Sequence, residues 1–218
     1  MSSAPIFAAA RYWEKRYATD GPLWGDGPSE LARLAVARLR SSVAAVRGAD
    51  AVPLTLIDVG CGYGRDCRYL AAELGCRVLG LDPAPAAVAA ARRTRRPDLD
   101  VEYLAGDAAS LADDAAQAGR FDVAFAGNVY HLLSPGGLLF LSTLSPRDPQ
   151  HYAVGEPVLG EERSWAEHVY LHFCTADELT ADFSAFTVLD LEERSYEEHN
   201  TGGVVHRHAS WFLEARRR

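Results

Sequence analysis

Two aspartates and three closely spaced glycines have the types and spacing to hold a small charged ligand. The stretch 54–66 reads LTLIDVGCGYGRD, an apolar run followed by glycines at alternate positions. Such a run predicts a buried strand, a glycine turn and the first turn of a helix. Glycine permits positive φ and lets a ligand approach the main chain, while the amides of a helix start favour a negative group. Asp58 precedes the turn, and Asp82 ends a second apolar run 24 positions later (82 − 58).

The glycine spacing distinguishes two classes of ligand. A dinucleotide fingerprint requires G-x-G-x-x-G, in which the third glycine fits the helix against the strand beside a pyrophosphate. Here the glycines at 60, 62 and 64 give G-x-G-x-G, and Arg65 occupies the position of that third glycine. Asp58 would repel a pyrophosphate but suits a cofactor that carries an ammonium group and no phosphate. Asp82, at the tip of the second strand, is placed to accept hydrogen bonds from ribose hydroxyls.

Strand, glycine turn, helix and spaced acid, in this order, resemble the class I S-adenosylmethionine-dependent methyltransferases. The glycine run matches the first motif of that family and Asp82 its second, and the resemblance covers about residues 54–145. It implies a Rossmann-like, doubly wound α/β fold with a seven-stranded sheet, mostly parallel with the last strand antiparallel, and helices on both faces. It also implies S-adenosylmethionine as the cofactor.

The resemblance assigns roles to named positions of this chain. Asp58, Gly60, Cys61 and Gly62 would cradle the methionine end of the cofactor. Asp82 and the adjoining Pro83 would meet the ribose side, Asp107 with Ala108 the adenine, and Asn128 the reacting methyl group. Asp107 also has an ordinary alternative role, because aspartate at this place commonly caps a helix, and both roles can hold together.

We expect one domain over 1–218, with a helical lid segment at 1–48, a cofactor-binding core at 54–145, and a substrate-side segment with closing strands at 146–218. An aromatic helix is predicted at 6–18 and a Gly/Pro-rich loop at 20–28, where Trp24 either packs on the domain's own surface or helps to cover the cofactor cleft. Ser29 is a helix cap, and Gly75 ends a helix that begins at Arg65. Further strands are predicted at 76–81, 101–104, 121–126, 138–141, 188–193 and 204–213.

One link departs from the family pattern. Only eleven residues separate Ala126 from Leu138 (138 − 126 − 1), whereas a parallel crossover needs a dozen or more, usually with a helix. Either this chain lost that helix, or the sequence lacks a segment that the natural protein has.

Methyl transfer from a sulfonium is an in-line displacement, so the protein mainly orients the partners and excludes water. A base is needed only where the acceptor carries a proton to lose, and the family has no fixed catalytic residue. His131 and Tyr130 follow the fourth strand and are the candidate general base and pocket residue. The alternative for His131 is a structural histidine.

Polar residues with metal-binding potential gather in the last third of the chain. His168, Tyr170, His172 and Cys174 would share one face of a strand, as would the pair His206 and His208. Their spacing matches no closed zinc pattern, so we predict no metal site and favour polar pocket lining or ordinary surface histidines.

The composition argues against two classes of binding partner, nucleic acids and membranes. The formal net charge of −8 over 218 residues argues against a nucleic-acid footprint. No C-x-x-C pair, no signal peptide and no membrane-spanning apolar run are present, which favours a reduced cytoplasmic protein and no membrane partner. The terminal Arg216–Arg218 is expected to be a frayed tail. The sequence does not indicate the oligomeric state.

The sequence thus favours S-adenosylmethionine-dependent methylation of a small-molecule acceptor. A narrower likeness to methyltransferases of the thiopurine and tellurite-resistance type rests on Arg65-Asp66, the segment around Trp13 and Trp24, and residues 206–211. Two alternatives stay open. One is a non-catalytic S-adenosylmethionine-binding protein on the same fold. The other is a nicotinamide-dependent oxidoreductase, which Arg65 in place of the third glycine disfavours.

Overall fold

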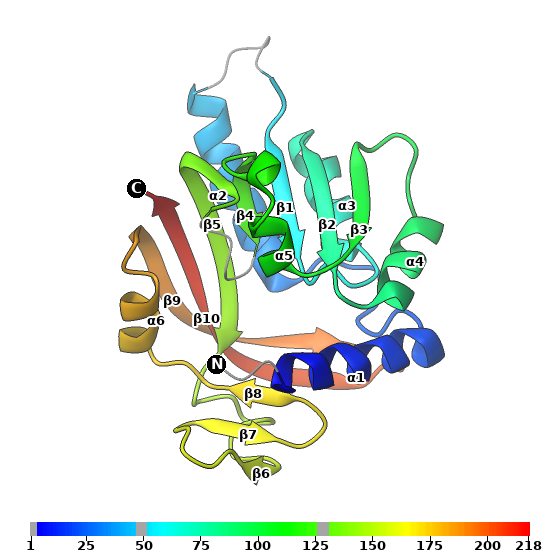
Figure 1. Ribbon diagram of the computed structural model, residues 1–218, viewed down its shortest axis with the longest axis vertical. Coiled ribbons are helices and arrows are strands. Elements are labelled where there is room, and N and C mark those ends of the chain that lie inside the picture. The colour runs from blue at the N-terminus through cyan, green and yellow to red at the C-terminus, as the bar shows by residue number, and fades with distance from the viewer. Residues whose placement is uncertain (1–3, 47–51, 126–130) are drawn as a thin grey trace.

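Apolar strands that alternate with helices along the chain assemble into one large sheet. The computed structural model describes residues 4–46, 52–125 and 131–218. Within these ranges seven strands pair in the order β3-β2-β1-β4-β5-β10-β9 (Figure 1). Neighbours from β3 to β5 pair in parallel, and β10 is antiparallel to both β5 and β9. The predicted fold class is confirmed. The strands are β1 Thr55–Val59, β2 Arg77–Asp82, β3 Val101–Ala105, β4 Phe121–Phe125, β5 Leu133–Leu144, β9 Phe186–His199 and β10 Val205–Arg217.

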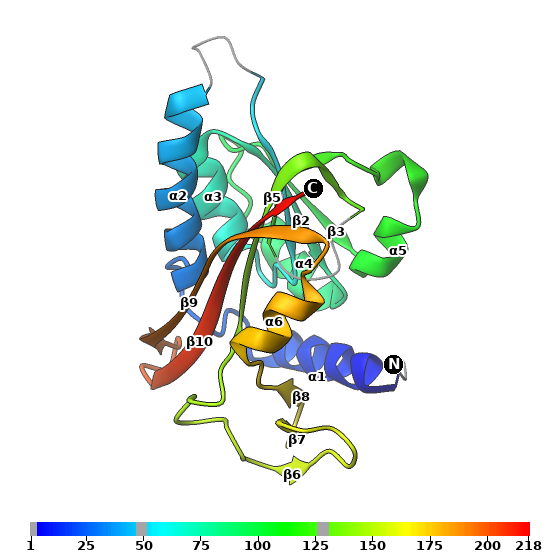
Figure 2. The same cartoon turned by 90° about the vertical axis from the view of Figure 1, so that its left-hand side faces the viewer.

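Helices cover both faces of this sheet. Helices α2 and α3 lie on one side and α5 on the other (Figure 2). A small antiparallel sheet, in the order β6-β7-β8, lies with α1 beyond the carboxyl ends of β1, β2 and β5 (Figure 1). None of the helices in the described ranges has an apolar stretch long enough to cross a bilayer. The remaining elements are α1 Ala4–Asp20, α2 Glu30–Val46, α3 Arg65–Leu74, α4 Pro85–Arg93, α5 Ala108–Ala112, the 3-10 turn Ala115–Gln117, β6 Glu156–Pro157, β7 Ser164–Ala166, β8 Tyr170–His172 and α6 Ala176–Asp182.

Local capping residues set the helix ends as the sequence predicts. The hydroxyl of Ser29 accepts the amide of Ala32 at 3.1 Å and begins α2. Gly75 ends α3 in the left-handed conformation, with φ 60°, and its amide donates to the carbonyl of Ala71. Thr175 and Glu178 form a reciprocal capping box at the start of α6. The predicted bounds of α3 are therefore confirmed at both ends.

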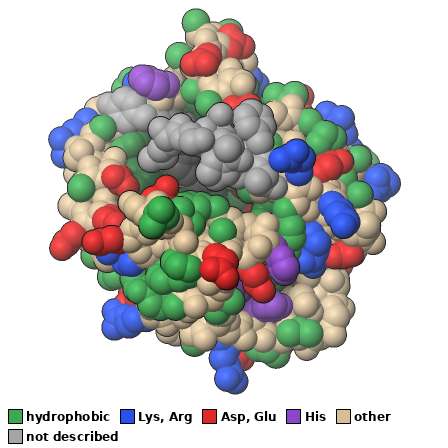
Figure 3. Space-filling view, turned by 60° about the horizontal axis from the view of Figure 1, so that its bottom comes forward, with side chains coloured by type: hydrophobic (Ala, Val, Ile, Leu, Met, Phe, Trp, Pro, Cys, Tyr) green, Lys and Arg blue, Asp and Glu red, His purple; other side chains and the backbone are tan. Residues whose placement is uncertain are grey.

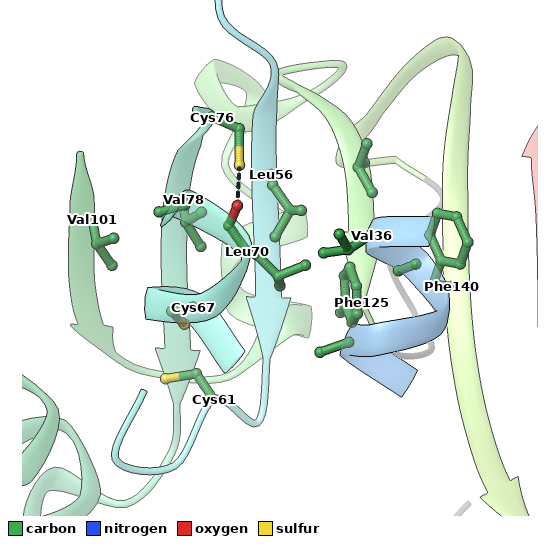
Figure 4. Close-up of a cluster of buried hydrophobic side chains, with 14 of the residues drawn as sticks. Val36, Leu56, Cys61, Cys67, Leu70, Cys76, Val78, Val101, Phe125 and Phe140 are labelled. Carbon is green, nitrogen blue, oxygen red and sulfur yellow. Dashed lines mark hydrogen bonds between the residues drawn. The ribbon is translucent and has the colours of Figure 1, made fainter. Parts of the chain in front are cut away.

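Two buried apolar clusters hold the layers together, one on each face of the sheet. On the α2/α3 face, Leu56 of β1 lies among Leu70, Val36, Phe125 and Phe140 (Figure 4). There the Cys76 thiol donates to the carbonyl of Leu70 at 3.6 Å. The cluster on the opposite face includes Ile57, Ala124, Leu139, Phe186 and Leu213. The strands β1, β4 and β5 each supply side chains to both clusters and so form the centre of the core.

We expect Gly80→Ala to lower the free energy of unfolding by about 2–3 kcal/mol, because added volume in a packed core forces its neighbours apart. A Cβ at Gly80 would lie 2.7 Å from the Tyr103 ring and 2.9 Å from the sulfurs of Cys61 and Cys67. Gly75→Ala is the matched control, since φ there is +60° and nothing lies within 4 Å of the added carbon. The control measures only the cost of placing alanine in a left-handed backbone conformation, which is about 1 kcal/mol. Urea unfolding of both variants measures the difference, and equal losses would contradict the described packing.

Two expectations about the last strands need correction. The β4–β5 link returns quickly to the amino end of β4, because Phe121 pairs with Leu133 and the Gly119 amide donates to the carbonyl of His131 at 2.9 Å. The fifth strand thus begins at 133, earlier than predicted, and residues 126–130 of the link lie outside the described ranges. The predicted frayed tail is wrong through Arg217, because β10 pairs with β9 up to that residue. Pairing on both sides orders this end of the chain.

Candidate functional site

The glycine turn predicted to hold a ligand forms a tight loop between β1 and α3. Gly60, Gly62 and Gly64 have φ of 81°, 55° and 75°, which side-chain-bearing residues rarely adopt. The amides of Gly60 and Cys61 donate to the carbonyl of Leu81 at 2.7 and 3.1 Å. These bonds fasten the loop to the end of β2, so that the loop lies at the carboxyl edge of the sheet.

Asp82 lies at the centre of this edge. Its side chain accepts the amide of Gly62 at 2.8 Å and the amide of Ala84 at 2.8 Å. Burial raises the pKa of Asp82, against the lowering effect of these two amides. The carboxylate therefore joins the glycine loop to the start of α4, and its orientation is fixed before any ligand arrives.

A second buried acid lies beneath the loop. Asp58 is 7% exposed, and the Cys67 thiol lies 3.1 Å from its carboxylate. Burial, followed by the charge of Asp66, raises the pKa of Asp58 to about 7. Burial also raises the pKa of the Cys67 thiol, which stays protonated and donates. A cationic group bound nearby would reverse the effect on Asp58 by favouring its charged form.

Arg65 follows the loop and connects it to distant parts of the chain. Its guanidinium pairs with Glu198 of β9 and donates to the carbonyl of Trp24 at 3.0 Å. The Trp24 amide in turn donates to the hydroxyl of Tyr63 at 3.1 Å. The residue that breaks the dinucleotide fingerprint thus fixes the loop that carries Trp24 against the glycine turn.

Helix α1 covers the glycine loop. A Cβ at Gly62 would lie 2.7 Å from the Tyr17 hydroxyl, so glycine is required for this approach. One turn earlier, the Glu14 carboxylate accepts the amide of Ala86 at the start of α4, at 2.8 Å. The aromatic N-terminal segment therefore contacts both walls of the predicted cofactor cleft.

The predicted adenine residues lie at the next strand end. Asp107 caps α5 by accepting the Ser110 amide at 2.8 Å and the Ser110 hydroxyl at 2.9 Å, which lowers the pKa of Asp107. The capping role is confirmed, and the exposed carboxylate adjoins Ala108, the first residue of that helix. Pro83 lines a shallow hollow of about 410 Å³ against α1, together with Pro85, Ala10, Arg11 and Glu14.

Of the two predicted catalytic residues, His131 lies within the described ranges. His131 is exposed and lies at the amino end of β4, where its carbonyl accepts the Gly119 amide. That is the opposite edge of the sheet from Asp82, so the prediction that His131 borders the reacting methyl is wrong. Phe125 ends β4 at the carboxyl edge, and by His131 the chain is already back at the amino edge, beside Gly119. Tyr130 and Asn128 lie outside the described residues.

A cavity of about 350 Å³, which we call the aromatic pocket, opens beside the carboxyl edge of the sheet. On this side of the molecule, hydrophobic and histidine side chains lie among acidic ones (Figure 3). The Trp24 and His206 rings meet edge to face there, with centroids 5.3 Å apart, and the Tyr12 and His168 rings stack at 6.0 Å. Its walls come from α1, the 20–28 loop, the end of β5, the β7–β8 turn and the β9–β10 hairpin. They comprise Tyr12, Trp13, Arg16, Leu23, Trp24, Leu144, His151, Val154, Glu167, His168, Val169, Leu171, Asn200, His206 and His208.

The predicted shared faces are confirmed for two pairs, Tyr170 with His172 and His206 with His208. The predicted four-residue face is wrong, because β8 spans only Tyr170–His172 and His168 lines the aromatic pocket instead. Ser164 hydrogen-bonds both the Tyr170 hydroxyl and His172 Nδ1, at 3.2 and 2.8 Å. The His206 and His208 rings stack 6.1 Å apart at 6°. Only the second pair reaches the aromatic pocket, because β8 turns its histidine toward the small sheet.

Sequence reasoning missed Asp148 and His151, which follow β5. Their side chains meet His208 of β10, so that one ligand-type atom from each of the three lies within 4.8 Å of the others. The available signal was an aspartate and a histidine three residues apart in a turn after a strand end. The partner sixty positions later carried no local signal.

Comparisons with known proteins agree with this geometry. A family model described as a methyltransferase domain matches residues 56–142. The chain is 29% identical over 148 residues to a ubiquinone biosynthesis O-methyltransferase of Nitrobacter winogradskyi, covering 60% of this chain and 54% of that protein. It is 31% identical over 117 residues to a 2-methyl-6-phytyl-1,4-hydroquinone methyltransferase of Synechocystis, covering 46% and 36%. The chain thus spans about half the length, or less, of these curated relatives.

Solved structures share the whole fold at low identity. A SAM-dependent methyltransferase from Anabaena variabilis aligns with a TM-score of 0.67 at 20% identity, over 97% of this chain and 94% of its own. The cyclase SpnF aligns with a TM-score of 0.57 at 18% identity, over 98% and 94%. The shared architecture extends beyond 56–142 to the β9–β10 hairpin and α1.

Proposed function

Since the chain belongs to the class I S-adenosylmethionine-dependent methyltransferase family, we propose that it transfers the methyl group of S-adenosylmethionine to a small-molecule acceptor. The bound cofactor supplies an electrophilic methyl group on a positively charged sulfur. The chain's own residues bind both partners, orient them in line and exclude water.

The observation that carries this proposal is the fixed carboxylate of Asp82 beside a loop of positive-φ glycines. Asp82 holds its two amide bonds and keeps lone pairs for ribose hydroxyls. Gly60, Cys61 and Gly62 let a ligand lie against the main chain, and the buried Asp58 favours an ammonium group. These groups fit S-adenosylmethionine and disfavour a pyrophosphate, which two acids would repel. We assign Asp107 and Ala108 to the adenine side and Pro83, next to Asp82, to the ribose side.

The acceptor is proposed to occupy the aromatic pocket. Trp24 lines that pocket while its backbone contacts Tyr63 and Arg65 of the glycine loop, so the two sites adjoin. The apolar and aromatic walls fit a flat, weakly polar molecule. The names of the relatives, which refer to quinone-type compounds, support the same size and character. We likewise propose the division into lid, core and substrate-side segments at 1–48, 54–145 and 146–218, and a cytoplasmic location.

Calorimetric titration of S-adenosylhomocysteine and of nicotinamide dinucleotides into the purified chain tests the cofactor. We expect saturable binding of the first and none of the second. Binding of nicotinamide dinucleotides alone would overturn the proposal in favour of an oxidoreductase.

A non-catalytic or non-methylating role is the second candidate, because SpnF has this fold and is named a cyclase. Turnover distinguishes the two. Methyl transfer to any acceptor, followed as formation of S-adenosylhomocysteine, supports the enzyme. Cofactor binding without turnover over a broad set of small aromatic acceptors supports the alternative.

We expect cofactor binding near pH 7 to release a proton from Asp58. Its pKa of about 7 leaves the free carboxyl about half protonated at that pH. A bound ammonium group favours the charged form, lowers this pKa and expels the proton. Calorimetry in buffers of different ionisation enthalpy measures the release as a slope. Asp58→Asn should remove the slope, and an unchanged slope in that variant would contradict the assignment.

A further inference from the structure

Asp148 is a buried acid whose surroundings are built around its charge. Its side chain is fully buried, in the turn after β5. Oδ1 accepts the backbone amides of Gln150 and His151 at 3.0 and 2.8 Å, and Oδ2 accepts the amide of Ala209 at 3.1 Å. Burial alone would raise its pKa, but hydrogen bonds from His151, His208 and the backbone hold the pKa of Asp148 well below its usual range. Asp148 is therefore a fixed anion.

This anion orients two imidazoles. His151 Nδ1 lies 3.0 Å from Oδ1 of Asp148, and His208 Nδ1 lies 3.4 Å from Oδ2. Because an ionised carboxylate only accepts, each Nδ1 carries the hydrogen and each Nε2 keeps its lone pair. Neither Nε2 makes a hydrogen bond to another residue of the described ranges. Both rings line the aromatic pocket, so two oriented basic nitrogens adjoin it.

The two rings differ in their exposure and in their bond to Asp148. They stack with centroids 5.3 Å apart at 10°, and two imidazolium ions at that separation would repel. The His151 side chain is 34% exposed and makes the shorter bond to Asp148, whereas the His208 side chain is 10% exposed. The Asp148 bond raises the pKa of His151 against burial, with a smaller contribution from Glu167. His151 is therefore the better proton acceptor.

Resting on the proposed function, we propose that His151 is the general base of the reaction, that Asp148 and His208 position it, and that the acceptor carries a phenolic hydroxyl. The hydroxyl proton moves to Nε2 of His151 while the oxygen forms a bond to the methyl carbon. The carbon–sulfur bond breaks, and its electron pair stays on sulfur as a neutral thioether. The positive charge passes from the sulfonium to the imidazolium, which Asp148 stabilises, and the proton then leaves to solvent.

The pocket's chemistry selects this acceptor class. Tyr12, Trp13 and Trp24 line the pocket with aromatic surface suited to an aromatic ring, and the imidazoles provide the polar contact. A phenol titrates near pH 10, about 3.5 units above an ordinary histidine, so its proton can pass to imidazole as the methyl group transfers. An aliphatic hydroxyl is far less acidic.

The same cluster fits a metal ion less well. Five N–H groups already point at Asp148, from three backbone amides and two imidazoles. A carboxylate offers about four lone-pair sites. A cation would have to displace several of these donors, so the arrangement is better explained as a hydrogen-bonded base.

The test compares His151→Gln with the parent on phenol, 4-cyanophenol and 4-nitrophenol, with S-adenosylmethionine as donor. General base catalysis contributes about 100-fold or more, so we expect the variant to lose about 100-fold in kcat/KM on phenol. On 4-nitrophenol, which is already about half ionised at neutral pH, the variant should retain most of its activity. In the parent, the rise of kcat/KM with pH should report the pKa of a histidine. In the variant it should report the pKa of the acceptor's hydroxyl.

His172→Gln is the matched control, because that histidine hydrogen-bonds Ser164 outside the aromatic pocket. It should keep the parent's pH profile. Asp148→Asn should shift the ascending limb to lower pH, since the bond that raises the pKa of His151 is weakened. S-adenosylhomocysteine affinity, measured on the same samples, shows that each variant is folded.

Each other outcome has a definite meaning. Equal loss on all three phenols, or no loss on any, would exclude His151 as the base. Loss of the parent's activity on adding EDTA would favour a metal site instead. A parent that binds S-adenosylhomocysteine but methylates none of the phenols would overturn the acceptor class while leaving the proposed function intact. A parent that fails to bind S-adenosylhomocysteine would overturn the proposed function itself.

Discussion

Asp82→Ala is expected to weaken the binding of S-adenosylhomocysteine about 100-fold. Two ribose hydroxyls would lose a charged partner, at about 1.5 kcal/mol or more each. The substitution also frees the amides of Gly62 and Ala84, which Asp82 accepts at 2.8 Å in the unliganded protein. The loop would then have to be ordered by the ligand, which adds to the loss. Calorimetric titration at neutral pH measures the change.

Asp100→Ala is the matched control for this experiment. Asp100 pairs with Arg77 at 3.0 Å, at the amino ends of β2 and β3, on the opposite edge of the sheet from Asp82. Its removal should leave the affinity unchanged. Comparable losses in the two variants would show that Asp82 has no special role in binding.

Asp148→Ala is expected to lower the free energy of unfolding by about 3 kcal/mol or more at pH 7. The amides of Gln150, His151 and Ala209 and both imidazole Nδ1 groups would lose their acceptor, and an unsatisfied buried group such as the Ala209 amide alone costs about 1–3 kcal/mol. Asp98→Ala, which removes an exposed acid paired with Arg96, should change stability little. Urea unfolding of the parent and both variants provides the measurement.

The contribution of Asp148 to stability should depend on pH in one direction. Its folded-state pKa lies well below the ordinary value of about 3.9. The unfolded state therefore binds the proton more readily, and the stabilisation is complete above about pH 5. It is lost as the pH falls below the unfolded value toward the folded one. The difference between the parent and Asp148→Ala should shrink over that acid range, and a constant difference would rule out an ionised Asp148.

The sequence was sufficient to predict those elements whose determining interactions are between residues close together in the chain. The strand, glycine turn and helix of 54–74 follow one another along the chain, and Gly75 ends the helix by its own backbone conformation. Asp82 could be placed because a parallel sheet brings the ends of successive strands to one edge. The capping role of Asp107 involves a residue only three positions away.

The acceptor side could not be predicted because its contacts are distant in sequence. Asp148 and His208 meet across sixty positions, through the pairing of β5 with β10. His131 was misplaced because its prediction assumed that residues after β4 stay at the carboxyl edge. The short link instead brings the chain back beside Gly119. Arg217 was misjudged for a related reason, since its pairing with Phe186 of β9 is a contact distant in sequence.

The placement of the aromatic pocket has a consequence for how such a protein can diverge. All of its wall residues fall within 12–24 and 144–208, whereas the family match covers 56–142. Substitutions that reshape the acceptor walls therefore leave the glycine loop and Asp82 untouched. After gene duplication, a copy can explore new acceptors while it inherits a working donor site. Recombination at the ends of the matched segment would exchange the proposed acceptor pocket as a unit, provided that contacts such as Arg65–Glu198 and Ala86–Glu14 are preserved across the junction.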